Sequence, residues 1–402
     1  MSKTHVIEDF HAISEGLKNP NLKQSLYDEG AMIMKDVLLT LHGEAHRKRR
    51  LLELRVFRRN FFDWYEKTIF PETLNSTISQ DIQRGRSELV DLGYRVTMNL
   101  TADFAGIDRP EKSSEETNKL LKMVETFSEG ATIVHSTRPK TEVIEELKEA
   151  MSEFKPRFLD PSVARRQILI EKFNRGLISE EELPRDVLTV ILLRGDDEEF
   201  TDEMLTREIA FYLQAGAHST ANSTIHAFHE ISTWANHDES RWLKLKDDPI
   251  FLQRAVHESF RLHPASPVAS RSAICPVKLN CIGDVSAGNK VEFRLAVANR
   301  DKQIFGKDAD DFNPERKING SIPPFGLTFG TGVHACLGRE LDGGALPREN
   351  VDPSRHQYGI VVLFLQRLFA LGATLSPDEK PLKATNTERP NWGYYPIVFT
   401  KE

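Results

Sequence analysis

Residues 329–338 read Phe-Gly-Thr-Gly-Val-His-Ala-Cys-Leu-Gly, and this stretch decides which fold the sequence indicates. Its glycines allow the backbone to turn tightly and to approach a flat ligand closely, and Phe329 can pack against such a ligand. A thiolate of Cys336, presented from this loop among backbone N–H groups, would be a strong ligand for iron. The alternative is a glycine-rich loop around a buried, inert cysteine, which is what most single cysteines are.

The composition is that of a soluble globular protein, and it excludes several classes. The 402 residues carry 53 Lys and Arg against 60 Asp and Glu, a net charge of −7, which argues against binding to nucleic acid. No apolar run approaches the roughly 20 residues of a membrane span, and no signal peptide is evident. Three cysteines, Cys275, Cys281 and Cys336, are too few for a disulfide framework or a four-cysteine metal site. We therefore expect a cytoplasmic enzyme or binding protein.

Most of the chain has the periodicity of amphipathic helices, which are expected over 71–84, 115–127, 141–154, 160–175 and 249–262. The longest expected helix covers 202–234, with Thr201 as its N-cap. Valine-rich segments within 266–293 indicate short strands, and 394–399 indicates another, at a sheet edge if it includes Pro396. No repeat or linker is evident. The sequence therefore predicts a single domain over 1–402, mainly α with a minor β region (α+β).

The loop at 329–338 resembles the haem-ligating loop of the cytochrome P450 family, the haem–thiolate monooxygenases, and four further stretches match in the family's order. Residues 215–217 are similar to the start of the kinked oxygen-binding stretch of the central helix. Glu258 and Arg261, followed by Leu-His-Pro, are similar to the family's Glu-x-x-Arg pair, and 298–301 and 311–316 are similar to the segments that follow it. The resemblance runs from about Gly43 to the C-terminus. It implies a soluble bacterial-type member, with a long central helix over haem b and a short N-terminal part.

The resemblance also implies which residues hold the haem. Cys336 would ligate the iron, and four basic residues match the family's contacts to the haem propionates, namely His46, Arg50, Arg271 and His334. The other positions that match haem contacts are Ala215, Gly216, Phe329, Gly330 and Gly338. A buried ion network with a structural role is implied for Glu258, Arg261 and Arg316.

The central helix departs from the family pattern Gly-x-acid-Thr. His218 stands in place of the acid and Ser219 in place of the threonine, with Thr220 one position further on. A serine hydroxyl can still donate to a distal oxygen and hold a water, and an imidazole can relay protons, so Ser219, Thr220 and His218 are the expected proton-handling residues. The alternative for His218 is an outward-facing side chain that relays nothing. Loss of the usual pair also leaves open a peroxide-dependent or non-oxidative reaction.

Two other departures concern the chain on either side of the cysteine loop. The stretch before His46 is shorter than in most family members, so part of the N-terminal helix and sheet would be missing or rebuilt. After Leu341, the expected helix is interrupted by an insertion at 342–357 and continues over 358–369. The insertion would be a loop by default, or would gate a redox partner or contact another protomer.

The substrate pocket can be placed only by similarity to the family, and its expected residues are Tyr212, Val268, Ala269, Trp392 and Tyr394. Ordinary core packing explains Tyr212 and Trp392 equally well, and the sequence indicates no particular substrate. His226, His229 and Glu230 superficially resemble a metal site on a helix, but a third ligand is missing and a solvated helix face is the preferred interpretation.

The expected function is that of a monooxygenase that hydroxylates, epoxidises or dealkylates a small organic molecule. The resemblance implies electrons from a ferredoxin with its reductase, or from a flavodoxin, and the basic run at 46–50 is a possible docking site for such an acidic partner. A solvated helix face explains this run equally well. The alternatives are a peroxide-dependent or non-oxidative haem–thiolate enzyme, and a haem-binding sensor with little turnover.

Overall fold

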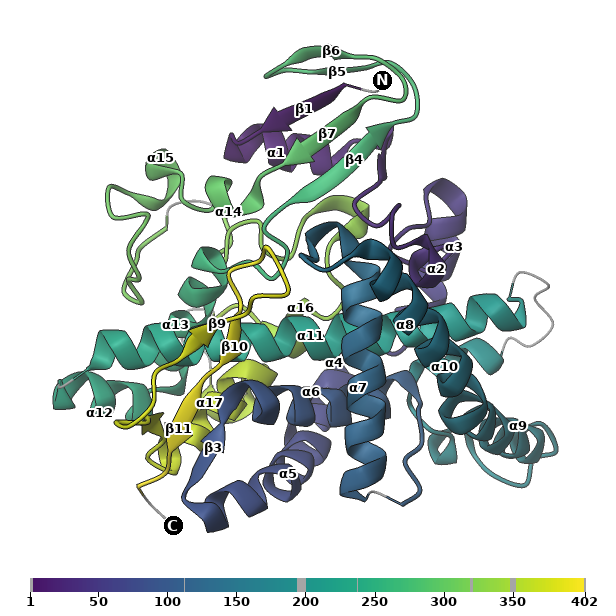
Figure 1. The fold of residues 1–402 in the computed structure, drawn as a ribbon, viewed down its shortest axis with the longest axis horizontal. Helices are drawn as coiled ribbons and strands as arrows, with labels where there is room; N and C mark the ends of the chain where they lie inside the picture. The colour runs from purple at the N-terminus through teal and green to yellow at the C-terminus, as the bar shows by residue number, and fades with distance from the viewer. Residues whose placement is uncertain are drawn as a thin grey trace.

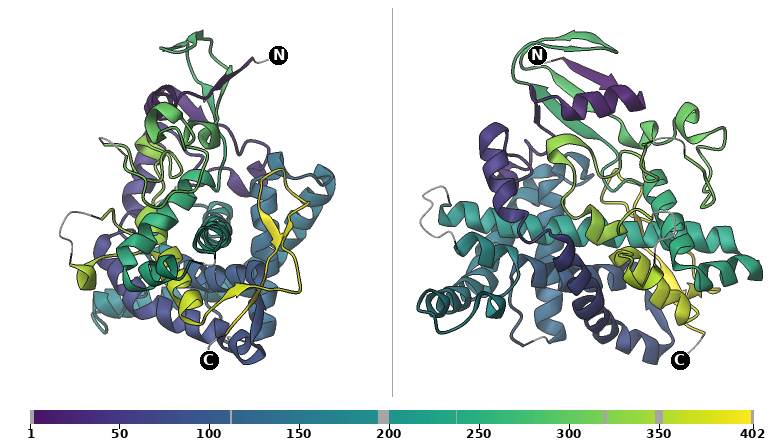
Figure 2. Two further views of the ribbon diagram at one scale, coloured as in Figure 1. Left: turned by 90° about the vertical axis from the view of Figure 1, so that its left-hand side faces the viewer. Right: turned by 180° about the vertical axis from the view of Figure 1, so that it is seen from behind.

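Helix α11 (Asp202–Ala235) crosses the whole molecule and organises the fold (Figure 1). The Thr201 side chain accepts a hydrogen bond from the backbone N–H of Met204, and acidic residues in the first turn favour the positive end of the helix dipole. With 34 residues at about 1.5 Å each, α11 is about 50 Å long. Viewed along its axis, it is surrounded by other elements (Figure 2), which confirms the predicted central helix.

The computed structural model describes residues 3–111, 113–193, 200–236, 238–318, 321–347 and 352–400. The α-helices other than α11 are α1 (Phe10–Lys18), α2 (Ala31–Met34), α3 (Gly43–Glu53), α4 (Arg59–Trp64), α5 (Phe70–Arg84), α6 (Leu89–Ala105), α7 (Ser114–Ala131), α8 (Lys140–Phe154), α9 (Asp160–Asn174), α10 (Val187–Leu192), α12 (Glu239–Asp247), α13 (Pro249–Leu262), α14 (Leu295–Ala298), α15 (Lys302–Phe305), α16 (Arg339–Gly343) and α17 (Ile360–Ala370). The predicted helices correspond to α5, α7, α8, α9, α11 and α13, and their ends differ from the predicted ends by a few residues at most.

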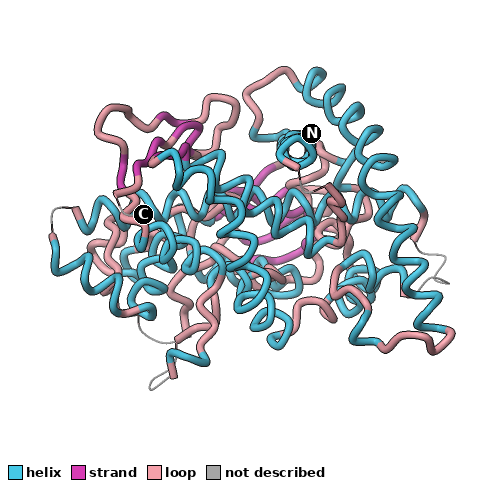
Figure 3. Tube along the Cα trace, turned by 90° about the horizontal axis from the view of Figure 1, so that it is seen from below, coloured by secondary structure: helices cyan, strands magenta, loops and turns pink. Residues whose placement is uncertain are grey.

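The strands are short and gather in two places of an otherwise helical chain (Figure 3). They are β1 (Thr4–Ile7), β2 (Leu22–Gln24), β3 (Arg86–Glu88), β4 (Ala269–Ala273), β5 (Val277–Leu279), β6 (Gly283–Val285), β7 (Lys290–Phe293), β8 (Thr374–Leu375), β9 (Leu382–Lys383), β10 (Trp392–Tyr394) and β11 (Pro396–Val398). A four-stranded sheet has the order β1-β7-β4-β2 and a three-stranded sheet the order β3-β11-β8, while β5-β6 and β9-β10 form separate pairs. The mainly helical fold with a minor β region is confirmed.

The N-terminal residues form part of the four-stranded sheet. β1 pairs in parallel with β7, and β2 pairs antiparallel with β4. Helix α1 packs so closely on this sheet that a Cβ at Gly16 would overlap the ring of Phe293. Although this part of the chain is short, it builds a helix and two sheet strands.

The edge position expected for a strand that contains Pro396 is wrong. β11 is the middle strand of its sheet and pairs with both β3 and β8. Pro396 is the first residue of β11, a position where a missing N–H is tolerated, and its carbonyl accepts a hydrogen bond from Ser376 N at 3.0 Å.

The helix after the cysteine loop is interrupted, as predicted, between α16 and α17. Gln253 of α13 bridges the described ends of this interruption, because its Nε2 donates to the carbonyls of Gly343 at 2.9 Å and Tyr358 at 3.2 Å. Glu66 accepts hydrogen bonds from the backbone N–H groups of Tyr358 and Gly359. These contacts fix the flanks of the inserted segment, of which residues 348–351 lie outside the described part.

The largest hydrophobic core surrounds α11, and a smaller one lies between α1 and the four-stranded sheet. α6 makes the most extensive contact with α11, where the Thr97 hydroxyl donates a 3.0 Å hydrogen bond to the carbonyl of Ala217. No helix in the described part of the chain is both long and apolar enough to cross a membrane.

Candidate active site

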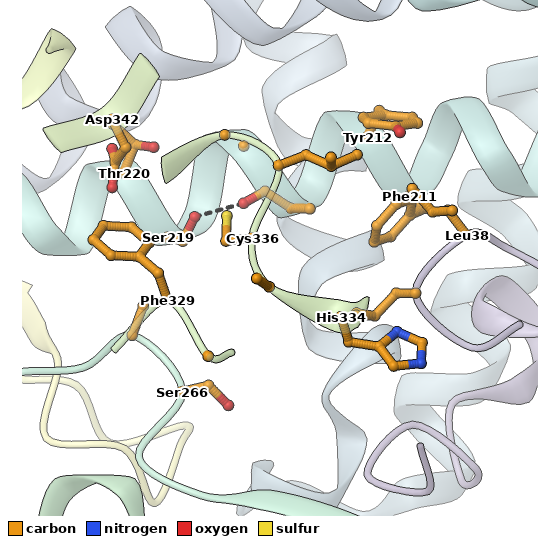
Figure 4. A pocket seen from close by; sticks show the side chains of 18 of the residues that line it. Leu38, Phe211, Tyr212, Ser219, Thr220, Ser266, Phe329, His334, Cys336 and Asp342 are labelled. Atoms are coloured by element: carbon orange, nitrogen blue, oxygen red, sulfur yellow. Dashed lines mark hydrogen bonds between the residues drawn. The ribbon is translucent and has the colours of Figure 1, made fainter. Parts of the chain in front are cut away.

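A cavity of about 370 Å³ lies between α11 and the loop that carries Cys336. The Cys336 side chain can be reached from within this cavity although protein surrounds it (Figure 4). Burial raises the pKa of its thiol to about 11, and the nearby carboxyl of Asp342 adds to this rise. A bound cation would favour the thiolate, which is the form that ligates metals.

The loop owes its shape to glycines and to aromatic packing. Gly330 and Gly332 have positive φ angles of 63° and 75°, and a Cβ at Gly332 would lie 3.0 Å from the carbonyl oxygen of Leu17. Cys336 N donates to the carbonyl of Phe329 at 2.9 Å, which closes the turn. The Phe329 ring packs edge-on against Phe325, with 4.9 Å between the ring centroids. The local sequence therefore holds the cysteine at the cavity wall.

Four basic residues from three parts of the chain meet at this cavity. His46 and Arg50 come from α3, Arg271 from β4 and His334 from the cysteine loop. Arg50 donates to the carbonyl of Ala335 at 2.7 Å, and the rings of His46 and His334 lie 4.2 Å apart. Nε2 of His46 and both ring nitrogens of His334 are buried without a partner among the described residues.

The pKa values of these groups are typical of a site that binds an anion. Burial, and then the positive charge of Arg50, lowers the pKa of His46 to about 4. Burial and the neighbouring His46 lower the pKa of His334 to about 3, and burial lowers that of Arg271 to about 10. Unpaired donors and unneutralised cations at one end of a cavity, with a cysteine on its wall, fit a haem whose propionates lie among the cations.

The wall opposite the cysteine loop is formed by Ala215, Gly216, Ser219 and Thr220 of α11. The Ser219 hydroxyl donates to the carbonyl of Ala215 at 2.6 Å (Figure 4). A Cβ at Gly216 would lie 2.9 Å from the side chain of Thr101, so α6 approaches α11 closely at this point.

Many residues at this cavity are not among those expected from the sequence, and three of these lie at or near the α11 wall. Asp342, which the sequence analysis expects in an insertion, lines the cavity beside Thr220. Thr97 and Thr101 of α6 line it too. Asp342 is the sixth residue after Cys336 and acidic, which is a signal in the sequence, whereas α6 carries no signal that it packs on α11.

His218 does not join the predicted proton-handling residues. Its Nδ1 lies 2.6 Å from the hydroxyl of Tyr94, which also accepts a hydrogen bond from Asn222. Burial, and then the charge of Arg389, lowers the pKa of His218 to about 3. The side chain lines a second cavity on another face of α11, because residue 218 is one position away from Ser219 on the helix.

The expected substrate-pocket residues divide in the same way. Tyr212, Val268 and Ala269 line the cavity of Cys336. Trp392 lines the second cavity, and Tyr394 lines neither, since its hydroxyl bonds to Glu379. The strand β10 that carries both residues therefore does not reach the cysteine cavity with these side chains.

The structure brings the expected ion network together. Arg261 donates to the Glu258 carboxylate at 2.7 and 2.8 Å, and Arg316 donates to the same carboxylate at 3.0 Å. Arg261 also caps the carbonyls of Asn299 and Ala309, both at 2.7 Å. The network ties α13 to the segment that leads to the cysteine loop.

Two interpretations as solvated helix faces are wrong for those members of each group whose side chains are buried or half-buried. His226 stacks on His263 with 4.4 Å between the rings, and His229 bonds to Tyr395 at 3.0 Å, so this is not a solvated helix face. Among the described residues, no cluster of three or more potential metal ligands occurs. In the basic run at 46–50, Arg49 is buried against Glu208 and His46 and Arg50 face the cavity, which leaves residues 47 and 48 outside.

The central helix lies above a cavity that has a cysteine loop on one side and basic groups near it. This arrangement is typical of helical proteins that enclose a flat anionic cofactor. The cytochrome P450 family model matches residues 5–341, and the chain belongs to this family. Cytochrome P450s are oxidoreductases, and their cofactor is haem b, bound through a cysteine thiolate.

Curated relatives are similar over parts of the chain. The self-sufficient cytochrome P450 monooxygenase CYP505E3 of Aspergillus terreus is 28% identical over 195 residues, which cover 42% of this chain and 19% of that protein. Nocardicin C N-oxygenase of Nocardia uniformis is 30% identical over 40% of this chain and 38% of its own length. The biotin biosynthesis cytochrome P450 of Bacillus subtilis is 24% identical over 78% of this chain and 71% of its own length. The chain thus spans well under half the length of the first two.

Solved structures are similar over nearly the whole chain. A crystal structure of P450BioI, in complex with acyl carrier protein ligated to hexadec-9Z-enoic acid, has a TM-score of 0.73 at 19% identity and covers 98% of this chain and 92% of its own. The structure of CYP109E1 from Bacillus megaterium with testosterone has a TM-score of 0.71 at 18% identity and covers 98% and 93%. At these identities the similarity shows the fold alone.

Proposed function

We propose that this protein is a haem–thiolate monooxygenase that oxidises a small organic molecule with dioxygen. The observation that carries the proposal is the position of Cys336 on the wall of a cavity whose end holds His46, Arg50, Arg271 and His334. When bound to the Cys336 thiolate, the haem would activate dioxygen for hydroxylation, epoxidation or oxidative dealkylation.

The residues around the cavity bind and orient the cofactor. His46, Arg50, Arg271 and His334 pair with the propionates and thereby regain the interactions that their burial has removed. Phe329 packs at the loop, and Gly330 and Gly338 leave room for close approach, since a Cβ at Gly338 would meet no atom within 4 Å. Ala215 and Gly216 have small side chains, which leave space for the cofactor at the α11 wall on the opposite side.

Ser219 and Thr220 are the residues that hold and move protons at the α11 wall. The Ser219 hydroxyl uses its single proton on the Ala215 carbonyl, and a rotation about its Cα–Cβ bond would turn this donor into the cavity. Thr220 lies beside Asp342, whose pKa burial raises to about 6, so an acid lies next to a cavity hydroxyl. His218 has no direct place in this route because it lines the other cavity.

The electrons would come from a ferredoxin with its reductase, or from a flavodoxin. The five residues 46–50 do not form a single basic docking surface, because only residues 47 and 48 of this run are exposed. The charges that can steer an acidic partner are therefore those of Lys48 and of Arg47, which is paired with Glu44. The rate of electron transfer to a partner docked here is therefore expected to depend less on salt concentration than it would with five exposed basic residues.

A peroxide-dependent reaction is the second candidate. It is favoured by the orientation of His218, because the helix position that carries an acid in the family supplies no group to the cysteine cavity. The two reactions are distinguished by turnover of the holoenzyme with isotopically labelled dioxygen, ferredoxin and reductase, and separately with hydrogen peroxide. Product that contains the label from dioxygen supports the monooxygenase. Turnover with hydrogen peroxide, together with no turnover with dioxygen, ferredoxin and reductase, supports the second candidate.

A further inference from the structure

A second cavity, of about 400 Å³, lies beside the cavity of Cys336 on another face of α11. It is lined by residues of α6, α7, α8 and α11 and of the C-terminal segment 384–393, which contains the first two residues of β10. On α11 the adjacent residues His218 and Ser219 line the second and the first cavity, respectively. On α6, Tyr94 lines the second cavity and Thr97, three positions further on, lines the first. The proposed monooxygenase reaction uses no group of the second cavity.

Arg389 lines this cavity and carries a buried positive charge. The residue is only 7% exposed, and its Nε has no hydrogen-bond partner among the described residues. Burial lowers the pKa of its guanidinium, and the groups that oppose this effect are the phenols of Tyr27 and Tyr94, not a carboxylate. A buried cation without a counter-ion is costly, so an anion is the missing partner.

The other buried arginines of the described chain show how unusual this is. Four of them are paired with a carboxylate, namely Arg49 with Glu208, Arg166 with Asp186, Arg207 with Glu203 and Arg261 with Glu258. The fifth is Arg271, which faces the cavity that fits the haem propionates. Arg389 therefore resembles the one buried arginine for which an external anion is already expected.

The acidic groups of the cavity wall do not neutralise Arg389. Arg138 lies between Glu129 at 2.9 Å and Glu146 at 2.5 Å. The carboxyl of Glu125 has a raised pKa, mainly through burial, and the cation that lowers it is Lys122. None of these three carboxyls is among the groups that shift the pKa of Arg389.

Two further polar groups of this wall lack partners, and both can donate. Trp392 Nε1 and Ser128 Oγ are buried without a hydrogen-bond partner among the described residues. The Trp392 nitrogen can only donate, as can the Arg389 guanidinium. The cavity therefore offers donors to a ligand rich in acceptor atoms, and its volume is that of a small-molecule site.

We propose that this second cavity binds a small organic carboxylate, with the carboxylate group paired with Arg389. The guanidinium matches a carboxylate with two parallel hydrogen bonds, and Trp392 and Ser128 supply further donors. Tyr27 lines the cysteine cavity and interacts electrostatically with Arg389, so the bound acid lies next to the place of oxidation. If the acid is the substrate itself, that identification rests on the proposed monooxygenase function.

The test compares two probes of the same shape, hydrocinnamate and its neutral amide, by isothermal titration calorimetry with the holoenzyme in a low-chloride buffer. We expect the acid to bind roughly tenfold or more tightly than the amide, as for a charge-assisted hydrogen bond. In Arg389→Gln this preference falls to about one, and in Arg389→Lys part of it returns. Lys122→Gln, which removes another positive charge from the same wall, leaves the preference in place.

Equal affinity of acid and amide for the wild type, or an unchanged preference in a folded Arg389→Gln variant, would overturn the proposal and leave a water-filled cavity. The haem absorbance recorded during the titration distinguishes two roles of the bound acid. A shift toward the high-spin form identifies a substrate that reaches the haem, and binding without a shift identifies a separate regulatory site. The calorimetric preference does not depend on turnover, so a failure of the monooxygenase proposal leaves this test intact.

Discussion

Thr220 of α11 and Asp342, six residues after Cys336, lie beside each other at the wall of the cysteine cavity (Figure 4), and the Thr220 side chain opposes the rise in the pKa of the Asp342 carboxyl. The Asp342 Oδ1 atom has no partner among the described residues, and burial raises the pKa of the carboxyl to about 6 from its ordinary 3.8. The pair connects the central helix to the segment that follows the cysteine loop. It places a weak acid at the edge of the haem site.

Asp342→Asn is expected to remove a pH-dependent component of stability. The folded carboxyl binds a proton more tightly than the unfolded one, so its contribution is complete below about pH 4 and is lost as the pH rises through about 6. The loss amounts to about 1–3 kcal/mol. Denaturant titrations of both proteins between about pH 4 and pH 7 measure it as a difference. Parallel pH profiles for the variant and the wild type would contradict a buried, titrating Asp342.

The sequence predicted those features of the fold and site that depend on local interactions. Helix α11 begins after the Thr201 cap, and α13 begins at Pro249 and ends two residues before Pro264, because caps and prolines act on neighbouring residues. The cysteine loop was found in the same way, since its glycines and Phe329 lie within ten residues of each other.

The features that were missed depend on contacts between distant segments. Whether His218 or Ser219 faces the cysteine cavity is decided by the packing of α6 on α11, which places Tyr94 against His218. The same limit applies to Trp392, whose orientation depends on where β10 crosses α11. Pro396 was misplaced because a strand's neighbours cannot be inferred from the strand alone.

The buried acids Glu53 and Glu208 respond differently to substitution. Glu208 is paired with Arg49 at 2.5 Å, whereas Glu53 accepts a 2.5 Å hydrogen bond from Tyr212, and burial beside Glu208 raises its pKa well above the usual range. Glu53→Gln keeps an acceptor for Tyr212 and is expected to change the free energy of unfolding by less than about 1 kcal/mol. Arg49→Met leaves Glu208 without its cation, and because burial raises the pKa of Glu208 to about 7 even beside Arg49, the expected cost of about 3–5 kcal/mol is seen above that pH and falls at lower pH as the carboxyl takes up a proton. Equal losses in urea titrations would show that Glu53 is ionised.

Removal of the Glu258 charge is expected to weaken the support of the cysteine loop. Glu258→Gln leaves the buried guanidinium of Arg261 without its carboxylate and leaves Arg316 with Asp308 as its remaining acidic partner, at a cost of about 3–5 kcal/mol. Haem retention and the free energy of unfolding are expected to fall together. The control is Glu44→Gln, which removes the partner of Arg47 in a solvent-exposed pair and is expected to have no measurable effect. Comparable effects of both substitutions would contradict a structural role for the network.

Ser219→Ala is expected to increase the hydrogen peroxide released per dioxygen consumed by about tenfold, because a cavity hydroxyl that moves protons is lost. The control is Thr224→Val, since the Thr224 hydroxyl makes the same type of bond, to the carbonyl of Thr220 at 2.8 Å, but does not line the cavity. Oxygen consumption and peroxide release are measured together in the reconstituted system. An unchanged release of hydrogen peroxide in Ser219→Ala would contradict proton transfer by Ser219 and would assign it to Thr220 and Asp342.

The assignment of Cys336 as the iron ligand is tested most directly by the absorbance of the reduced, carbon monoxide-bound protein. We expect the wild type to show the red-shifted Soret band of a thiolate ligand, and Cys336→Ala to lose this band even where it retains haem. The absence of the red-shifted band in the wild type, or its persistence in Cys336→Ala, would contradict the assignment.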